Sequence, residues 1–265
     1  ARNFTQEELI RAIHTAHIHG KKLYLTVNAL LKNRELKERL YDSLCPLYEE
    51  GLDAVIVQDL GVFQFIRNNF PGLHLHASTQ MTVTSVYSAK MLKEMGCCRV
   101  VPARELSLEE ISRIYKETGM DIETFVHGAL CYCYSGQCLM SSLIGGRSGN
   151  RGRCAQPCRL PYQVKNFRAK EYGKGEFCPL SLKDICTIEI LPEILEAGVT
   201  SLKIEGRMKT PEYAAGVVSI YRKYMDSYLD GSRIPVEKKD IRALLELGNR
   251  GGFTNGYYYH HNEIG

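Results

Sequence analysis

Apolar residues recur along the first half of the chain in two alternating patterns. Segments with an apolar residue every three or four positions predict amphipathic helices, and short runs rich in valine, isoleucine and leucine predict strands. The two kinds of segment follow one another five times. The predicted helices span residues 6–19, 36–50, 61–72, 85–96 and 107–119, and they precede predicted strands at 22–30, 53–59, 73–79, 98–105 and 121–128.

Each of these helices ends at a glycine, a residue that readily adopts the left-handed conformation that closes a helix before a turn. The five glycines are Gly20, Gly51, Gly72, Gly96 and Gly119. Ser107 and Glu110 form a capping box at the start of the fifth helix. Strands joined by helical crossovers predict a parallel sheet covered by helices, either an open doubly wound sheet or a (β/α)8 barrel.

The alternation stops after residue 128 and resumes later. Residues 160–184 predict a β-hairpin with a polar tip, and a helix at 188–197, a strand at 200–206 and a helix from Thr210 towards Tyr228 follow. The six strands are fewer than the eight of a barrel, and the chain starts at Ala1 rather than at methionine. We therefore expect a (β/α)8 TIM-barrel-like fold that lacks its first βαβ unit.

We expect the chain to divide into two parts. Residues 1–234 form the barrel-like catalytic domain, which includes a Cys-rich insertion at 129–180. Residues 235–265 form a C-terminal extension that packs on the barrel or begins a further segment. The chain has no apolar run of membrane-spanning length and no signal peptide pattern, so we expect a cytoplasmic protein.

The charge of the chain is informative in one segment only. The formal net charge of +4 is too small to indicate nucleic acid by itself. Between Arg147 and Lys174, however, there are eight Lys or Arg residues and one acidic residue, Glu171. This basic stretch overlaps the cysteines. Its ordinary interpretation is a solvated loop, and its functional interpretation is a contact with RNA phosphates.

Nine of the ten cysteines lie between Cys97 and Cys186, and this crowding favours a metal site over a disulfide scaffold. The spacing is irregular and rich in glycine, which suits a loop that wraps an iron–sulfur cluster better than a zinc ribbon with two close pairs. Zinc and a set of buried free thiols remain alternatives. The spaced cysteines are Cys131, Cys138, Cys154, Cys158 and Cys178.

Polar residues follow the predicted strands, at the edge where parallel α/β folds place their sites. About half of them are explained as caps of the next helix. This explanation does not cover three cations, Arg104, Lys203 and Arg207, which together predict a site for a carboxylate or phosphate. The alternative is that each cation forms a structural ion pair, for example Lys203 with Glu205.

Two histidines are candidates for acid–base chemistry. His76 could act as a general base or as a ligand. A lone histidine on an alternating strand is more commonly a hydrogen-bonded core residue. His127 precedes Cys131, so the two could also form the nucleophile and base of a cysteine peptidase. The common hydrolase, zinc-peptidase and nucleotide-binding motifs are absent from the sequence.

The segment ETFVHGALCYCYSGQCLMSS, residues 123–142, resembles the signature of the collagenase-like peptidase family U32. The segments SLKIEGRMKTPEY at 201–213, LHLHASTQMTVTS at 73–85, CPLSLKDIC and NRGGFTNGYY extend the resemblance over nearly the whole chain. Members of this family usually begin with a βαβ unit that this chain lacks.

The resemblance implies an oxygen-independent hydroxylase with a [4Fe-4S] cluster, acting on a tRNA or 23S rRNA base or on a quinone precursor. For the RNA enzymes it implies prephenate as the hydroxyl donor. It places the cluster ligands at Cys131, Cys138, Cys154 and Cys178, with Cys158 as the alternative fourth ligand and Cys133 incidental.

We therefore predict hydroxylation of an RNA base, with the three cations holding the anionic donor. His76, Arg104, His127 and Glu205 are the catalytic candidates. A peptidase and a zinc-stabilised binding module are the alternatives, and the oligomeric state is not predicted.

Overall fold

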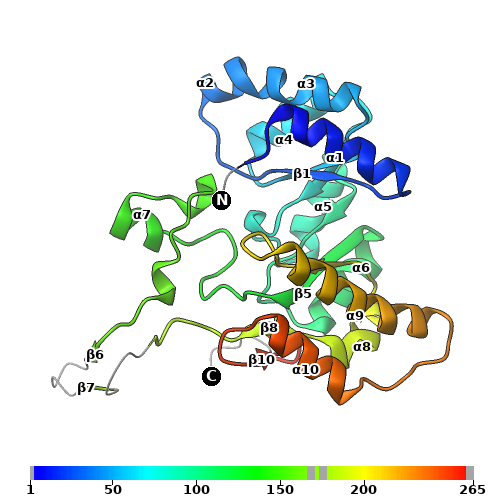
Figure 1. Ribbon diagram of the computed structural model, residues 1–265. Coiled ribbons are helices and arrows are strands. Elements are labelled where there is room, and N and C mark those ends of the chain that lie inside the picture. The colour runs from blue at the N-terminus through cyan, green and yellow to red at the C-terminus, as the bar shows by residue number, and fades with distance from the viewer. Residues whose placement is uncertain (1–2, 166–170, 173–177, 261–265) are drawn as a thin grey trace.

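The structure is a computed structural model that describes residues 3–165, 171–172 and 178–260. Its centre is a parallel sheet with strands in the order β1-β2-β3-β4-β5, and β9 pairs with the other side of β5 (Figure 1). These strands are β1 (Tyr24–Val27), β2 (Ala54–Val57), β3 (His74–Ala77), β4 (Arg99–Val100), β5 (Asp121–Gly128) and β9 (Val199–Ile204). All six expected strands are present, and the parallel sheet is confirmed.

Helices alternate with these strands, as the sequence pattern predicts. They are α1 (Gln6–Ile18), α3 (Tyr41–Glu49), α4 (Leu60–Asn69), α5 (Val86–Glu94), α6 (Leu108–Thr118), α8 (Leu191–Glu196) and α9 (Pro211–Leu229). A short helix α2 (Asn33–Glu35) and a π-helical turn (Leu36–Leu40) lead into α3. The capping box at Ser107 and the left-handed Gly119 that ends α6, with a φ of 62°, are both present.

The core lies between the sheet and these helices. Val55 and Val57 of β2 are fully buried, and so are Phe63 and Ile66 on the inner face of α4. Burying an aliphatic or aromatic side chain of this size contributes about 1.5–3 kcal/mol. The helices are held on the sheet by this packing, because isolated helices of their length are marginal in water.

Barrel closure is not confirmed. Within the described residues, β1 pairs with β2 and β9 with β5, and β1 does not pair with β9. Two unpredicted short strands extend the sheet: β8 (Asp184–Cys186) runs antiparallel to β5, and β10 (Phe253–Thr254) runs parallel to β8. The fold is thus a mixed α/β fold with a largely parallel sheet.

The predicted hairpin is present only in part. Strands β6 (Val164–Lys165) and β7 (Glu171–Tyr172) form a separate antiparallel pair that projects from the body (Figure 1). The tip and residues 173–177 lie outside the described residues. Asp184, expected at the end of the hairpin, belongs instead to β8 of the main sheet.

The C-terminal segment packs on the rest of the molecule. Helix α10 (Lys238–Leu247) lies against α9, where the Lys223 side chain binds the carboxylates of Glu237 and Asp240. The Tyr258 hydroxyl donates to the Phe125 carbonyl oxygen at 2.6 Å. No helix among the described residues is both long and apolar enough to cross a membrane.

Candidate functional site

The Cys-rich insertion lies across the carboxyl ends of the parallel strands. At β1 and β2, the Gln58 side chain and the Leu30 backbone both donate to the Asn150 carbonyl oxygen, at 2.8 and 3.0 Å. Arg151 donates to the Leu30 carbonyl oxygen at 2.7 Å and forms an ion pair with Glu35. These contacts fix one end of the insertion at the edge where parallel sheets carry their sites.

A second anchor, centred on the buried Ser135, holds the insertion at β3 and β4. The Ser135 backbone donates to Glu105 Oε1 at 3.0 Å, and the Thr82 hydroxyl donates to the Ser135 carbonyl oxygen at 2.6 Å. Arg104 Nε donates to Ser135 Oγ at 3.1 Å. Arg104, predicted to hold a substrate, therefore also positions the cysteine loop.

Gly136, the next residue, must be a glycine. Its φ is +76°, and a Cβ at this position would lie 2.1 Å from the Gln80 carbonyl oxygen. A side chain would therefore displace the loop from the end of β3. The close approach explains the single glycine between Cys131 and Cys138.

The thiols of the insertion lie near one another. The pKa of Cys158 is raised by burial and by the negative charges of Cys131, Cys154 and Cys138, and the nearby Arg159 opposes this shift. The Gln156 backbone donates to Cys154 Sγ at 3.3 Å. Among the described residues, no three His, Cys, Asp or Glu side chains are close enough to hold a single metal ion.

The donor set nevertheless fits an iron–sulfur cluster chemically. Its ligands would be thiolates on a glycine-rich loop, which suits this cofactor. A cluster is larger than one ion, so its ligands lie further apart. Cys131, Cys138 and Cys154 would hold it with either Cys178 or Cys158.

Arg159 joins the segments that carry these cysteines. Its guanidinium donates to Ser181 Oγ at 2.9 Å, to the Leu182 carbonyl oxygen at 2.8 Å and to the Leu130 carbonyl oxygen at 2.6 Å. Leu130 directly precedes Cys131, and Ser181 ends the turn that begins at Cys178. The half-buried Arg159 thus connects the turn of Cys158 to two other segments that carry expected ligands.

A cluster of buried polar side chains lies beside β5, and His127 is the one member of it that the sequence predicts as a candidate. A register shift in the pairing of β5 with β9 lies between Phe125 and His127, and the His127 ring contacts Tyr213 and Tyr221 of α9. Burial and the Lys209 charge lower the pKa of His127 to about 4, so its imidazole is neutral at pH 7.

Two members of this group have no counterpart in the predictions. Asp184 is fully buried, and neither of its carboxylate oxygens has a hydrogen-bond partner within the described part of the chain. The same holds for the Tyr213 hydroxyl and for His127 Nε2. Burial and the Asp184 charge raise the pKa of Tyr213 to about 12. The pairing of β8 with β10 brings this cluster together, because it places Asp184 opposite Phe253, whose ring contacts His127. The sequence carries no signal for this pairing.

His127 and Cys131 do not form a peptidase dyad here. Nδ1 of His127 lies 3.4 Å from the Tyr221 hydroxyl, and Nε2 has no hydrogen-bond partner among the described residues. A thiolate nucleophile needs a base within hydrogen-bond reach.

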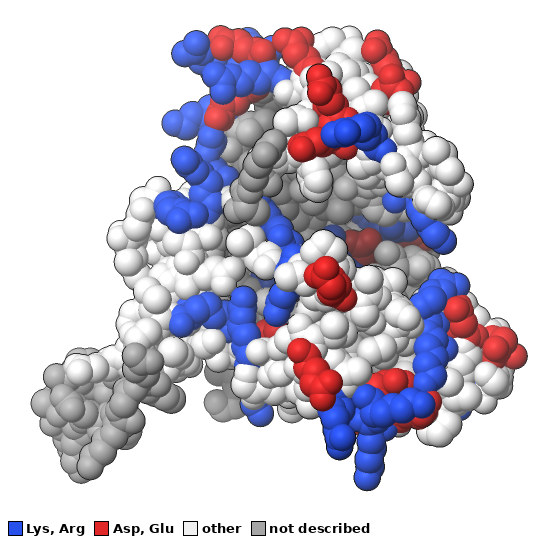
Figure 2. All heavy atoms as spheres, viewed as in Figure 1, with Lys and Arg blue, Asp and Glu red and all other residues white. Residues whose placement is uncertain are grey.

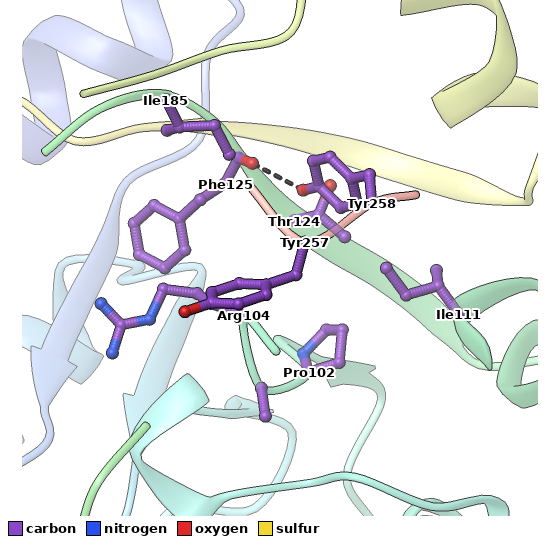
Figure 3. A pocket seen from close by; sticks show the side chains of 9 residues that line it. Pro102, Arg104, Ile111, Thr124, Phe125, Ile185, Tyr257 and Tyr258 are labelled. Atoms are coloured by element: carbon purple, nitrogen blue, oxygen red, sulfur yellow. Dashed lines mark hydrogen bonds between the residues drawn. The ribbon is translucent and has the colours of Figure 1, made fainter. Parts of the chain in front are cut away.

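A small pocket lies where β4, β5 and the C-terminal segment meet. Arg104, Phe125 and Tyr257 lie together at one side of it (Figure 3). Its volume is about 10 Å³, the space of roughly one water molecule. The pocket itself therefore admits no large substrate in this conformation, and a larger ligand would lie at its mouth.

A family model described as Peptidase family U32 matches residues 1–265. The chain belongs to this family. It is 39% identical over 226 residues to the "23S rRNA 5-hydroxycytidine C2501 synthase" of Escherichia coli, covering 84% of this chain and 34% of that protein. It is 37% identical to the "tRNA hydroxylation protein P1" of Bacillus subtilis, covering 94% and 60%.

A third relative of this U32 chain carries a peptidase name. The "Uncharacterized protease" of Methanocaldococcus jannaschii is 39% identical and is matched over 98% of this chain and 64% of its own length. The chain thus spans between about a third and two thirds of these relatives.

One of the three cations of the predicted substrate site of this U32 chain is ion-paired. Lys203 pairs with Glu123, at 2.7 Å, and not with Glu205, so the predicted Lys203–Glu205 pair is wrong. The two strands β5 and β9 are direct neighbours, which the sequence could not show. Arg207 is exposed, and its backbone donates to Glu205 Oε1 at 3.2 Å. The assignment of Arg104, Lys203 and Arg207 to substrate binding remains a prediction.

His76 belongs to the same polar network as Lys203. Arg99 lies 3.6 Å from Glu123 and over the Tyr24 ring, which the His76 ring meets edge-on at 4.8 Å. Burial and the Arg99 charge lower the pKa of His76 to about 4. Its buried Nδ1 has no hydrogen-bond partner among the described residues, so a role as neutral base stays a prediction.

The basic stretch of this U32 chain is only partly described. Residues 129–163 contain four arginines and no acidic residue. Arg147 and Arg153 are exposed, and Figure 2 shows Lys and Arg side chains around this side of the molecule. The rest of the predicted RNA contact, at the tip of the hairpin, lies outside the described residues.

Proposed function

We propose that the protein hydroxylates a base of RNA without molecular oxygen, using a [4Fe-4S] cluster and prephenate as hydroxyl donor. The observation that carries the proposal is the anchoring of a five-cysteine loop across the strand ends, beside Arg104 and in a basic, acid-free segment. Two relatives named for hydroxylation of 23S rRNA and tRNA support the reaction type.

The proposed chemistry explains the choice of thiolate ligands. Replacing a C–H bond by C–OH removes two electrons and one proton from the base, so the proposed reaction needs an external two-electron acceptor besides the hydroxyl donor. A bound [4Fe-4S] cluster supplies one-electron redox chemistry, tuned by its surroundings. The Gln156 N–H that donates to Cys154 Sγ is one such influence, because hydrogen bonds to a ligand sulfur stabilise its negative charge.

The other residues of the site bind and orient. In this proposal Arg104 binds a carboxylate of the donor, since a guanidinium matches a carboxylate in two-point contact. Arg147 and Arg153 are exposed. In this proposal they bind RNA phosphates, and these contacts would provide salt-dependent, sequence-independent affinity. Prephenate and the cluster are implied by the family resemblance.

The test is mass spectrometry of RNA nucleosides from cells with and without the gene. We expect one hydroxylated nucleoside to disappear with the gene and to return on complementation. Unchanged nucleosides in both tRNA and rRNA would refute the proposed function, and peptide cleavage by the purified protein under the same conditions would favour the peptidase.

A matched pair of cysteine variants tests the cluster. We expect the anaerobically purified protein to contain about four irons per chain and to absorb visible light, and Cys138→Ser to lose both. Cys133→Ser serves as the control, because Cys133 lies on the same loop and is not an expected ligand. Equal iron loss in both variants would refute the ligand assignment, and one zinc without iron would support the binding module.

A further inference from the structure

Two exposed tyrosines stand beside the expected cluster ligands. Tyr132 lies between Cys131 and Cys133, and Tyr134 follows Cys133. Their side chains are 50% and 53% exposed, although large aromatic side chains usually contribute to a core. The anchors at Ser135 and Gly136 hold the backbone of this loop, so the rings are presented to solvent from a fixed support.

The loop that carries the two rings lies beside Arg104, because Arg104 Nε donates to the hydroxyl of Ser135, the residue after Tyr134, at 3.1 Å. The pKa of Tyr257 is raised by burial and by the negative charges of Glu105, Tyr134 and Tyr132, and Arg104 opposes this shift. Tyr257 itself lines the pocket (Figure 3). The loop of Tyr132 and Tyr134 therefore lies next to Arg104, which lines a space too small for a nucleobase.

We propose that Tyr132 and Tyr134 form a stacking platform for an unpaired RNA base at the mouth of the Arg104 pocket. The inference rests on the proposed function and names the part of the protein that receives the base. Base stacking on aromatic side chains is the usual way in which proteins hold unpaired bases.

Charge complementarity favours RNA as the occupant. No acidic residue occurs in residues 129–163, and the exposed Arg147 and Arg153 follow on the same insertion. An enzyme that modifies a base must first remove it from its stack, and an aromatic platform offsets part of the cost of unstacking. The arginines bind the backbone and the tyrosines receive the base.

The experiment measures binding of a fluorescently labelled RNA hairpin with a single-stranded loop and of the matching uninterrupted duplex, using the anaerobically purified protein. Tyr132→Leu and Tyr134→Leu should each weaken hairpin binding, by about five-fold to a hundred-fold, and leave duplex binding unchanged. Tyr132→Phe and Tyr134→Phe, which keep the ring, should bind the hairpin like the unmodified protein.

Tyr87→Leu is the matched control, because Tyr87 is 84% exposed on α5, outside the insertion. Arg153→Gln should reduce the salt dependence of binding by about one unit of slope, whereas the tyrosine variants should leave the slope unchanged.

The outcomes separate this inference from the function on which it rests. If the unmodified protein binds neither RNA and no nucleoside depends on the gene, the proposed function fails. If it binds the hairpin and the two leucine variants behave like Tyr87→Leu, or weaken hairpin and duplex equally, the stacking platform is refuted. Thermal unfolding of each variant shows whether a loss comes from misfolding.

Discussion

Replacing Arg159 by glutamine should loosen the cysteine insertion and lower the stability of the whole protein. The guanidinium makes three hydrogen bonds, to the carbonyl oxygens of Leu130 and Leu182 and to the Ser181 hydroxyl. Leu130 is 4% exposed, so its carbonyl oxygen would lose its partner in a place that water reaches poorly.

The magnitude follows from these three contacts. A buried polar group left without a partner costs about 1–3 kcal/mol, and each remaining bond contributes about 1 kcal/mol. Leu182 and Ser181 are only half-buried and can be rehydrated. We therefore expect Arg159→Gln to lower the free energy of unfolding by about 2–4 kcal/mol, and the melting temperature by roughly 5–12 °C.

Urea unfolding followed by far-ultraviolet circular dichroism measures this loss, since the chain has no tryptophan to report by fluorescence. Arg113→Gln is the control, because Arg113 is a 76% exposed arginine in an i,i+4 pair on α6, worth about 0.3–0.5 kcal/mol. Iron content after anaerobic reconstitution is the second readout and should also fall. If Arg159→Gln unfolds at the same urea concentration as Arg113→Gln and retains its iron, the reasoning is wrong.

Two further perturbations probe the same region. Gly136→Ala should destabilise the protein by about 2–4 kcal/mol through a backbone clash at positive φ, whereas thermal unfolding of Gly145→Ala, where a Cβ meets nothing within 4 Å, should be almost unchanged. Because the folded-state pKa of His127 is about 4 against 6.5 unfolded, its neutral form stabilises the fold fully above pH 6.5, and about 3 kcal/mol is lost as the pH falls to 4. Urea unfolding between pH 4 and 7 should therefore show a weaker pH dependence in His127→Gln than in His19→Gln; equal slopes would contradict the assigned burial.

The features that the sequence predicted are those with local causes. Each strand and helix of the βα alternation is recognisable from its own periodicity, and Gly119 or the Ser107 cap acts within a few residues. The approximate location of the site was also predictable, because the loop that follows β5 must lie at the carboxyl edge of a parallel sheet.

The features that the sequence did not predict depend on contacts between distant segments. Lys203 has an acidic residue two positions away, yet it pairs with Glu123, which lies across the β5–β9 ladder. Strand β8 has three residues and β10 has two, too few for an alternating pattern. The buried Asp184 consequently looked like an ordinary polar residue of a hairpin.

Arg159 contacts the turns of both candidates for the fourth ligand of the proposed cluster. Cys158 is its direct neighbour, and Cys178 begins the turn whose Ser181 it binds. One guanidinium therefore links the turns that carry both alternatives. If the proposed cluster is bound, loss of Arg159 should weaken its binding whichever cysteine is the ligand, so we propose Arg159 as a positioning residue of the candidate site.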